Sequence, residues 1–128
     1  MEPALRVKSI PGKGRGVVAA RAFDEGDVLE RAPVLVITAE DWEQAGTTIL
    51  ARYCFGWREG AGDSALVLGH CSLLNHSYAP NAWACSYIAD RAIEFVALRD
   101  IAEGDEITIN YNGDPDSDGP MDFRVRRR

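Results

Sequence analysis

The sequence predicts a mostly β, single-domain protein, and three observations support this fold class. Short runs of alternating or β-branched residues recur along the chain, and Gly, Pro, Asn and Asp separate them. Only one segment has the spacing of a helix. The chain has 128 residues, 46% of them hydrophobic, which suits one domain with its own core.

The expected strands are short and spread over most of the chain. We expect them at 5–9, 17–20, 28–30, 34–37 and 65–68, with a hairpin from 83–88 and 92–98 and a last strand over 107–111. Residues 107–111 alternate cleanly. The two-residue period therefore places Tyr111 on the same face as Ile107 and Ile109, with its ring buried.

The helix candidate spans 38–54. Thr38 can cap its N-terminus, with Asp41 three residues on. Gly46 and the β-branched pair that follows it weaken the helical pattern. This segment is therefore expected to form one interrupted helix or two short ones.

Charge and cysteine content limit the class of partner and compartment. The formal net charge is -6, which disfavours direct nucleic-acid binding and suits a basic protein partner or simple solubility. Residues 1–10 lack the apolar stretch of a signal peptide, and no apolar run approaches the roughly 20 residues that span a bilayer. Three cysteines give no disulfide framework. We expect a cytoplasmic protein that does not insert in a membrane.

A metal site is not expected from the soft side chains. No C-x-x-C pair occurs, and the spacings match no common zinc pattern. Buried thiols that pack as small hydrophobic groups are the favoured interpretation. The residues concerned are Cys54, His70, Cys71, His76 and Cys85.

Three segments carry unusual chemistry, and each has two interpretations. The glycines of Gly14-Arg15-Gly16 suit close approach of a ligand or a tight turn. Asn75 and His76 follow two leucines, so they are partly buried and either bind a polar ligand or satisfy structural hydrogen bonds. Tyr111 is either an active-site phenol or an ordinary core tyrosine.

In this order, the motifs resemble those of the SET-domain family. The matching residues are Gly14-Arg15-Gly16, Asn75-His76-Ser77 with Pro80-Asn81, and Gly104-Asp105-Glu106-Ile107-Thr108 to Tyr111. The resemblance implies a SET-domain core over 1–111 and a short tail over 112–128 that stands where other members carry a post-SET module. It also implies a β-clip of small curved sheets, one or two short helices and a C-terminal pseudoknot, in which the Asn-His segment crosses the last strand.

The resemblance further implies a protein-lysine N-methyltransferase that uses S-adenosylmethionine as its only cofactor. The substrate would be a lysine in a basic protein or peptide segment, and a homodimer is compatible with the sequence. Tyr111 and Tyr53 would be catalytic. The cofactor-binding residues would be Lys13, Gly14, Arg15, Gly16, Tyr53, Asn75, His76, Tyr111 and Phe123, the last as an aromatic cover.

Departures from the family pattern leave alternatives open. The chain lacks the cysteine-rich zinc modules of many members, so it is most similar to the minimal viral and bacterial ones. Gly113 stands where an aromatic is common, and Ile109 stands where Phe or Tyr affects the number of methyl groups added. One alternative is a SET-fold module that binds cofactor or a basic peptide without turnover. Another is a structural protein of similar fold that binds no cofactor.

Overall fold

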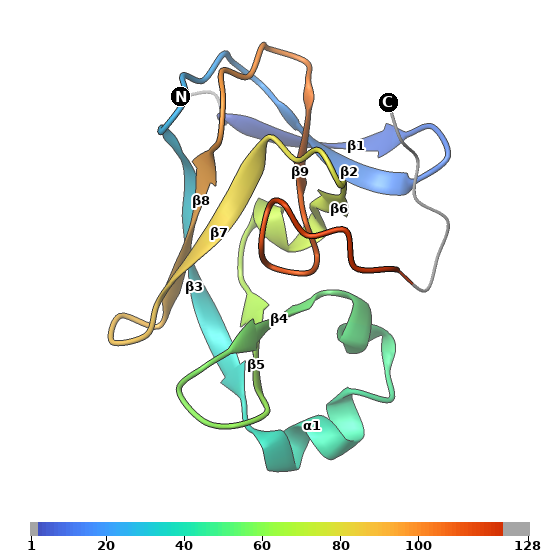
Figure 1. Ribbon diagram of the computed structural model, residues 1–128, viewed down its shortest axis with the longest axis vertical. Helices are drawn as coiled ribbons and strands as arrows, with labels where there is room; N and C mark the ends of the chain where they lie inside the picture. The colour runs from blue at the N-terminus through green and yellow to red at the C-terminus, as the bar shows by residue number, and fades with distance from the viewer. Residues whose placement is uncertain (1–2, 122–128) are drawn as a thin grey trace.

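A computed structural model describes residues 3–121 and confirms a mostly β fold (Figure 1). The described residues form a four-stranded and a five-stranded sheet. The smaller sheet has the order β1 (Leu5–Ile10), β2 (Gly14–Ala19), β9 (Glu106–Ile109) and β6 (Asn75–His76). The larger has the order β4 (Cys54–Trp57), β5 (Asp63–Val67), β3 (Val28–Ile37), β8 (Ala92–Ala97) and β7 (Ala82–Tyr87).

Strand β3 replaces the two separate strands expected at 28–30 and 34–37. The strand stays continuous because a different neighbouring strand pairs with each of its halves. Its first half pairs with β8 as far as Pro33, and its second half pairs with β5 from Val34 onwards. Pro33 lacks an N–H donor but accepts a hydrogen bond from the Leu68 amide through its carbonyl (3.0 Å). A proline at this changeover is therefore compatible with one long strand.

The helical segment breaks in two, as Gly46 suggested. Helix α1 (Ala39–Ala45) begins after Thr38, whose hydroxyl accepts a hydrogen bond from the Asp41 amide (3.2 Å), and it ends at Gly46. The 3-10 helix η1 (Ile49–Arg52) follows, and a second one, η2 (His70–Leu73), precedes β6. No helix among the described residues has the length and apolar character to cross a membrane. Strand β4 was missed, because its short sequence Cys-Phe-Gly-Trp has no clear alternation.

The hydrophobic core is shared by the two sheets. Val17 and Ile107 contribute from the smaller sheet, and Trp57 and Phe95 contribute from the larger one. Cys71 is fully buried among them, as expected of a packed thiol, whereas Cys54 and Cys85 are half-buried.

Strand β9 enters between β2 and β6, far from both in the sequence. It pairs antiparallel with β2, where Val17 faces Ile107. It pairs parallel with β6, where Asn75 faces Thr108 and His76 faces Ile109. All four residues of β9 are buried, because both faces of the strand are covered. The expected meeting of the Asn-His segment and the last strand is confirmed.

The last strand ends at Ile109, so its expected extension to Tyr111 is wrong. The Asn110 side chain turns the chain by donating to the Ser117 carbonyl (2.7 Å) and accepting from the Asn112 amide (3.0 Å). Tyr111 consequently leaves the apolar face of β9 and is 43% exposed. The expectation that its ring continues that buried face is also wrong.

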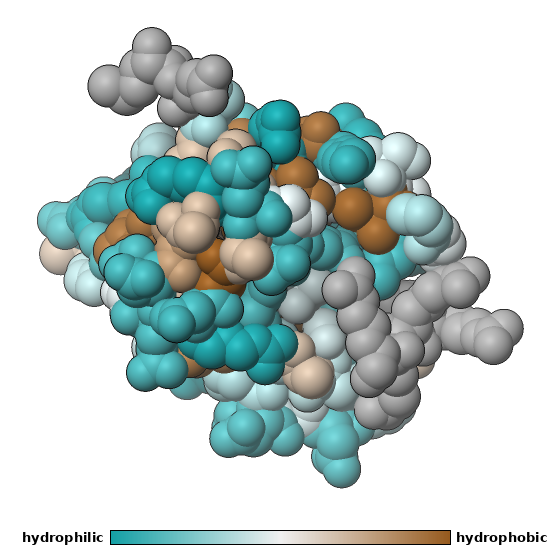
Figure 2. All heavy atoms as spheres, turned by 90° about the horizontal axis from the view of Figure 1, so that it is seen from above, coloured by the Kyte–Doolittle hydropathy of each residue, from teal (hydrophilic) through white to brown (hydrophobic). Residues whose placement is uncertain are grey.

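The molecular surface is largely polar on the face seen in Figure 2. Hydrophilic side chains cover most of that face, and hydrophobic residues form small, separate patches. This distribution agrees with a chain that carries 20 acidic and 14 basic residues.

Candidate functional site

A cleft of about 1080 Å³ gathers most of the predicted site residues. Its walls come from the loop before β2, the segment from η1 to β4, the strand β6 and the turn after β9. The predicted residues in the lining are Lys13, Gly14, Arg15, Tyr53, Asn75, His76 and Tyr111. Gly16 lies behind this wall rather than in it, and Phe123 lies outside the described residues.

The two glycines at the start of β2 have different roles. Gly14 has φ +80°, a backbone conformation that favours glycine, and a Cβ added there would meet nothing within 4 Å. At Gly16, an added Cβ would lie 2.7 Å from Nδ2 of Asn75 and 2.8 Å from Oε2 of Glu106. Gly14 therefore allows the turn and leaves backbone open to the cleft, whereas Gly16 allows Asn75 and Glu106 to approach β2.

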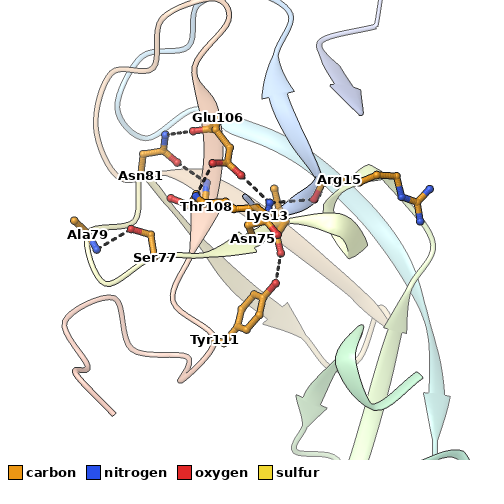
Figure 3. A network of polar contacts seen from close by, with 10 residues as sticks. Lys13, Arg15, Asn75, Ser77, Ala79, Asn81, Glu106, Thr108 and Tyr111 are labelled. Atoms are coloured by element: carbon orange, nitrogen blue, oxygen red, sulfur yellow. Dashed lines mark hydrogen bonds and ion pairs between the residues drawn. The ribbon is translucent and has the colours of Figure 1, made fainter. Parts of the chain in front are cut away.

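Asn75 and Glu106 form the centre of a polar network (Figure 3). Asn75 donates through Nδ2 to the Arg15 carbonyl (3.0 Å) and to Oε2 of Glu106 (2.8 Å). Lys13 Nζ lies 2.7 Å from Oε1 of the same carboxylate, and the Glu106 side chain is only 3% exposed. The network joins the glycine loop, β6 and β9. Sequence reasoning assigned Glu106 no role, although an acidic residue directly before the buried run Ile-Thr-Ile was a usable signal.

Asn81 fixes the backbone of β9 beside this network. Its side chain donates to the Glu106 carbonyl and accepts from the Thr108 amide, both at 2.9 Å (Figure 3). At the end of β9, the Ser77 amide donates to the Ile109 carbonyl (2.9 Å). The Asn-His segment therefore has a structural role in holding the last strand, and the same segment lines the cleft.

Tyr111 is held against the Asn-His segment at both ends. Its amide donates to Nδ1 of His76 (2.9 Å), and its hydroxyl donates to the Leu74 carbonyl (2.6 Å; Figure 3). Burial of the phenol raises the pKa of Tyr111 to about 12, and the nearby Tyr53 and Glu106 act in the same direction. The phenol therefore stays protonated at neutral pH and acts as a hydrogen-bonding group rather than as a base.

The cleft lining has the opposite charge to the whole chain. Within the described residues, no Asp or Glu side chain lines it, whereas four basic residues do: Lys13, Arg15, Arg52 and Arg58. Lys13 is neutralised by Glu106, which lies behind the wall. Nearby positive charges of this kind lower the pKa of an amine and so favour its neutral form.

The fold and the site together define a class of protein. A mostly β domain in which an Asn-His strand pairs with the last strand beside a cleft has the features that the motif resemblance implied. The family model described as "SET domain" matches residues 14–112. The chain belongs to the SET-domain family of protein-lysine methyltransferases.

The chain is similar to two known proteins, of which the first supports the family and the second the fold. The chain is 34% identical to the histone-lysine N-methyltransferase, H3 lysine-37 specific, of Schizosaccharomyces pombe. The 108 aligned residues make up 84% of this chain and 72% of that protein. A crystal structure of a Plasmodium falciparum protein, described as a candidate histone methyltransferase, matches with a TM-score of 0.69. It covers 87% of this chain and 95% of that chain at 24% identity, and it supports the fold alone.

Proposed function

We propose that this protein transfers a methyl group from S-adenosylmethionine to the ε-amine of a lysine in a protein substrate. The observation that carries the proposal is the meeting of Tyr111, Asn75 and the open glycine loop in one cleft. The two alternatives are a module of the same fold that binds cofactor or a basic peptide without turnover, and a structural protein of similar fold that binds no cofactor.

The acceptor atom that Asn75 can offer to a ligand in the cleft fits this cofactor. Both N–H groups of the Asn75 amide are engaged by the Arg15 carbonyl and by Glu106, so the amide has only its oxygen left for a ligand. An oxygen acceptor suits an ammonium group, and S-adenosylmethionine carries one on its methionine part. The cofactor would supply a methyl group activated on a sulfonium. The backbone of 13–15, with Asn75 and His76, would hold it.

The protein's own contribution would be positioning and electrostatics. A free lysine has a pKa of about 10.4, so its deprotonation at pH 7 costs roughly 4.6 kcal/mol. The guanidinium groups of Arg15, Arg52 and Arg58 in the lining would disfavour an ammonium and lower that pKa. Tyr53 and Tyr111 would orient the neutral amine next to the methyl group. Tyr111 would not act as a base, because its own pKa is about 12.

Replacing the phenol of Tyr111 tests its role directly. We expect Tyr111→Phe to stay folded and to bind S-adenosylhomocysteine nearly as well as the wild type. Its rate of methyl transfer should fall by about 100-fold or more, since loss of one positioned polar group has that effect in other active sites. Radiolabelled S-adenosylmethionine with a lysate, followed by mass spectrometry of labelled proteins, measures the transfer and identifies the lysine.

The matched control is Tyr87→Phe. Tyr87 lies on β7 outside the cleft lining, and its hydroxyl contacts Glu94 (3.2 Å). This variant should transfer methyl groups at the wild-type rate. Wild-type turnover by Tyr111→Phe would refute the role of Tyr111, and a wild-type protein that binds cofactor but labels no protein would favour the module without turnover.

A further inference from the structure

The carboxylate of Glu106 receives donors from two separate elements. Oε1 accepts from Lys13 in the glycine loop (2.7 Å), and Oε2 accepts from Asn75 on β6 (2.8 Å). The Glu106 side chain is 3% exposed and the Lys13 side chain 13% exposed, so the ion pair is shielded from water. Asn81 fixes the backbone of Glu106 through the Glu106 carbonyl. The carboxylate is therefore a rigid acceptor with both oxygens in use.

This arrangement determines which way the Asn75 amide faces. An amide has one donor end and one acceptor end, and the two ends are exchanged by a flip of the side chain. The Arg15 carbonyl and Oε2 of Glu106 are both acceptors, so only the nitrogen end fits between them. The oxygen end is then the one that remains for a ligand in the cleft, which Asn75 lines.

Resting on the function proposed above, we propose that Glu106 is a positioning residue that orients the Asn75 amide, so that the cleft presents an oxygen acceptor to the ammonium group of the cofactor. Lys13 is the counter-ion that holds the carboxylate in place. Glu106 acts through Asn75 and touches neither the cofactor nor the substrate lysine.

The Glu106→Gln variant breaks this arrangement with minimal change in shape. A glutamine has one oxygen, so it can accept from Lys13 or from Asn75 but not from both. The donor that does not bind this oxygen faces the NH₂ group of the glutamine, which is itself a donor. The charged ammonium of Lys13 is the stronger of the two donors and takes the oxygen. The Asn75 amide then loses the partner that held its orientation.

Two ligands separate this positioning role from a general loss of structure. S-adenosylhomocysteine contains the amino acid group, whereas 5′-methylthioadenosine has the adenosine and thioether but no ammonium. By calorimetry, we expect Glu106→Gln to bind S-adenosylhomocysteine about tenfold or more weakly, in line with loss of a hydrogen bond to a charged group. Its affinity for 5′-methylthioadenosine should change by less than about threefold on the same grounds. An equal loss for both ligands, or no loss for either, would overturn the proposal.

A double variant covers the case in which Glu106→Gln unfolds. Lys13→Met with Glu106→Gln removes the buried ion pair as a unit, so no charge is left unpaired. The single oxygen of the introduced glutamine is then free to accept from Asn75, and we expect most of the affinity for S-adenosylhomocysteine to return. A double variant that folds yet shows no preference for S-adenosylhomocysteine over 5′-methylthioadenosine would also contradict the role.

The control is Glu103→Gln, an exposed residue of the same acidic turn, and it should bind both ligands like the wild type. A wild-type protein that binds neither ligand would refute the proposed cofactor, and the positioning role would fall with it. A wild-type protein that binds both, together with a Glu106→Gln variant of unchanged ligand preference, would refute the positioning role alone.

Discussion

At the scale of single residues, Tyr111 shows how a partly exposed side chain can have a protected functional group. The residue is 43% exposed, yet its hydroxyl donates to the Leu74 carbonyl at 2.6 Å and its pKa is raised to about 12. Exposure of the residue as a whole is therefore compatible with a hydrogen-bonded phenol oxygen, the atom to which we assign a role in the proposed reaction. A phenol with a fixed carbonyl acceptor has its remaining lone pairs directed by that bond, which suits the orientation of an incoming amine.

The raised pKa of Tyr111 predicts a specific loss of stability in alkali. An unfolded tyrosine ionises near pH 10 and the folded one near pH 12, so the unfolded state loses its proton first. Folding stability from this residue is complete below about pH 10 and is lost as pH rises towards about 12. In urea denaturation, the stability difference between wild type and Tyr111→Phe should be constant from pH 7 to about 9 and should shrink above pH 10. A difference independent of pH up to about 11.5 would contradict the shift.

At the scale of elements, sequence pattern predicted what depends on local chemistry. The 83–98 hairpin, the capping of α1 by Thr38 and its end near Gly46 all rest on neighbouring residues, and all were found. The continuity of β3 through Pro33 depends on two partner strands that lie elsewhere in the chain. Such pairings are set by tertiary contacts, which no local pattern reports.

The same distinction explains the site. Motif order identified Asn75, His76 and Tyr111, and the structure brings them together at one cleft. Glu106 was missed because its importance arises from Lys13, which lies almost a whole domain away in the sequence. The exposure of Tyr111 was missed because the Asn110 side chain, rather than strand periodicity, determines where β9 ends.

The close approach of Asn75 on β6 to Gly16 on β2 leads to a prediction about the stability of the fold. Gly16→Ala would place a Cβ 2.7 Å from both Nδ2 of Asn75 and Cγ1 of Ile10. Such overpacking typically costs about 1–3 kcal/mol of stability, and it should also weaken S-adenosylhomocysteine binding by displacing Asn75. Denaturant unfolding and calorimetry measure the two effects.

Gly56→Ala is the matched control for that substitution. Gly56 lies in β4 at the cleft wall, and an added Cβ there meets nothing within 4 Å. This variant should be as stable as the wild type or slightly more stable. Equal stability of Gly16→Ala and Gly56→Ala would show that β2 and β6 can separate without cost.

At the scale of the whole molecule, charge is divided between the surface and the cleft. The chain has a net charge of -6, whereas the described cleft lining is basic. A group of acidic side chains follows Tyr111 in the sequence, and all three are exposed: Asp114, Asp116 and Asp118. A basic substrate segment would therefore be attracted by this rim, while the lysine that enters the cleft would be favoured as a neutral amine.

Removing the charge of this acidic rim tests whether it attracts a basic substrate segment to the cleft. In the variant with Asp114, Asp116 and Asp118 all changed to Asn, we expect a KM for a basic peptide several-fold higher at low salt. The difference should fade as salt approaches about 1 M, where screening is strong. The affinity for S-adenosylhomocysteine should stay the same, because the cofactor region is unchanged. An unaltered KM at low salt would show that the rim does not take part in substrate attraction.

The insertion of β9 between β2 and β6 has a consequence for synthesis on the ribosome. Translation releases β2 and β6 before β9, and because each of them pairs with β9 rather than with the other, this part of the sheet cannot be completed until residues 106–109 have emerged. Until then, both strands present unpaired edges, which are prone to association with other nascent chains. A cofactor molecule could not rescue such an intermediate, because the wall that holds Asn75 in place does not yet exist. Competence to bind would arise in a single late step rather than grow with the length of the polypeptide.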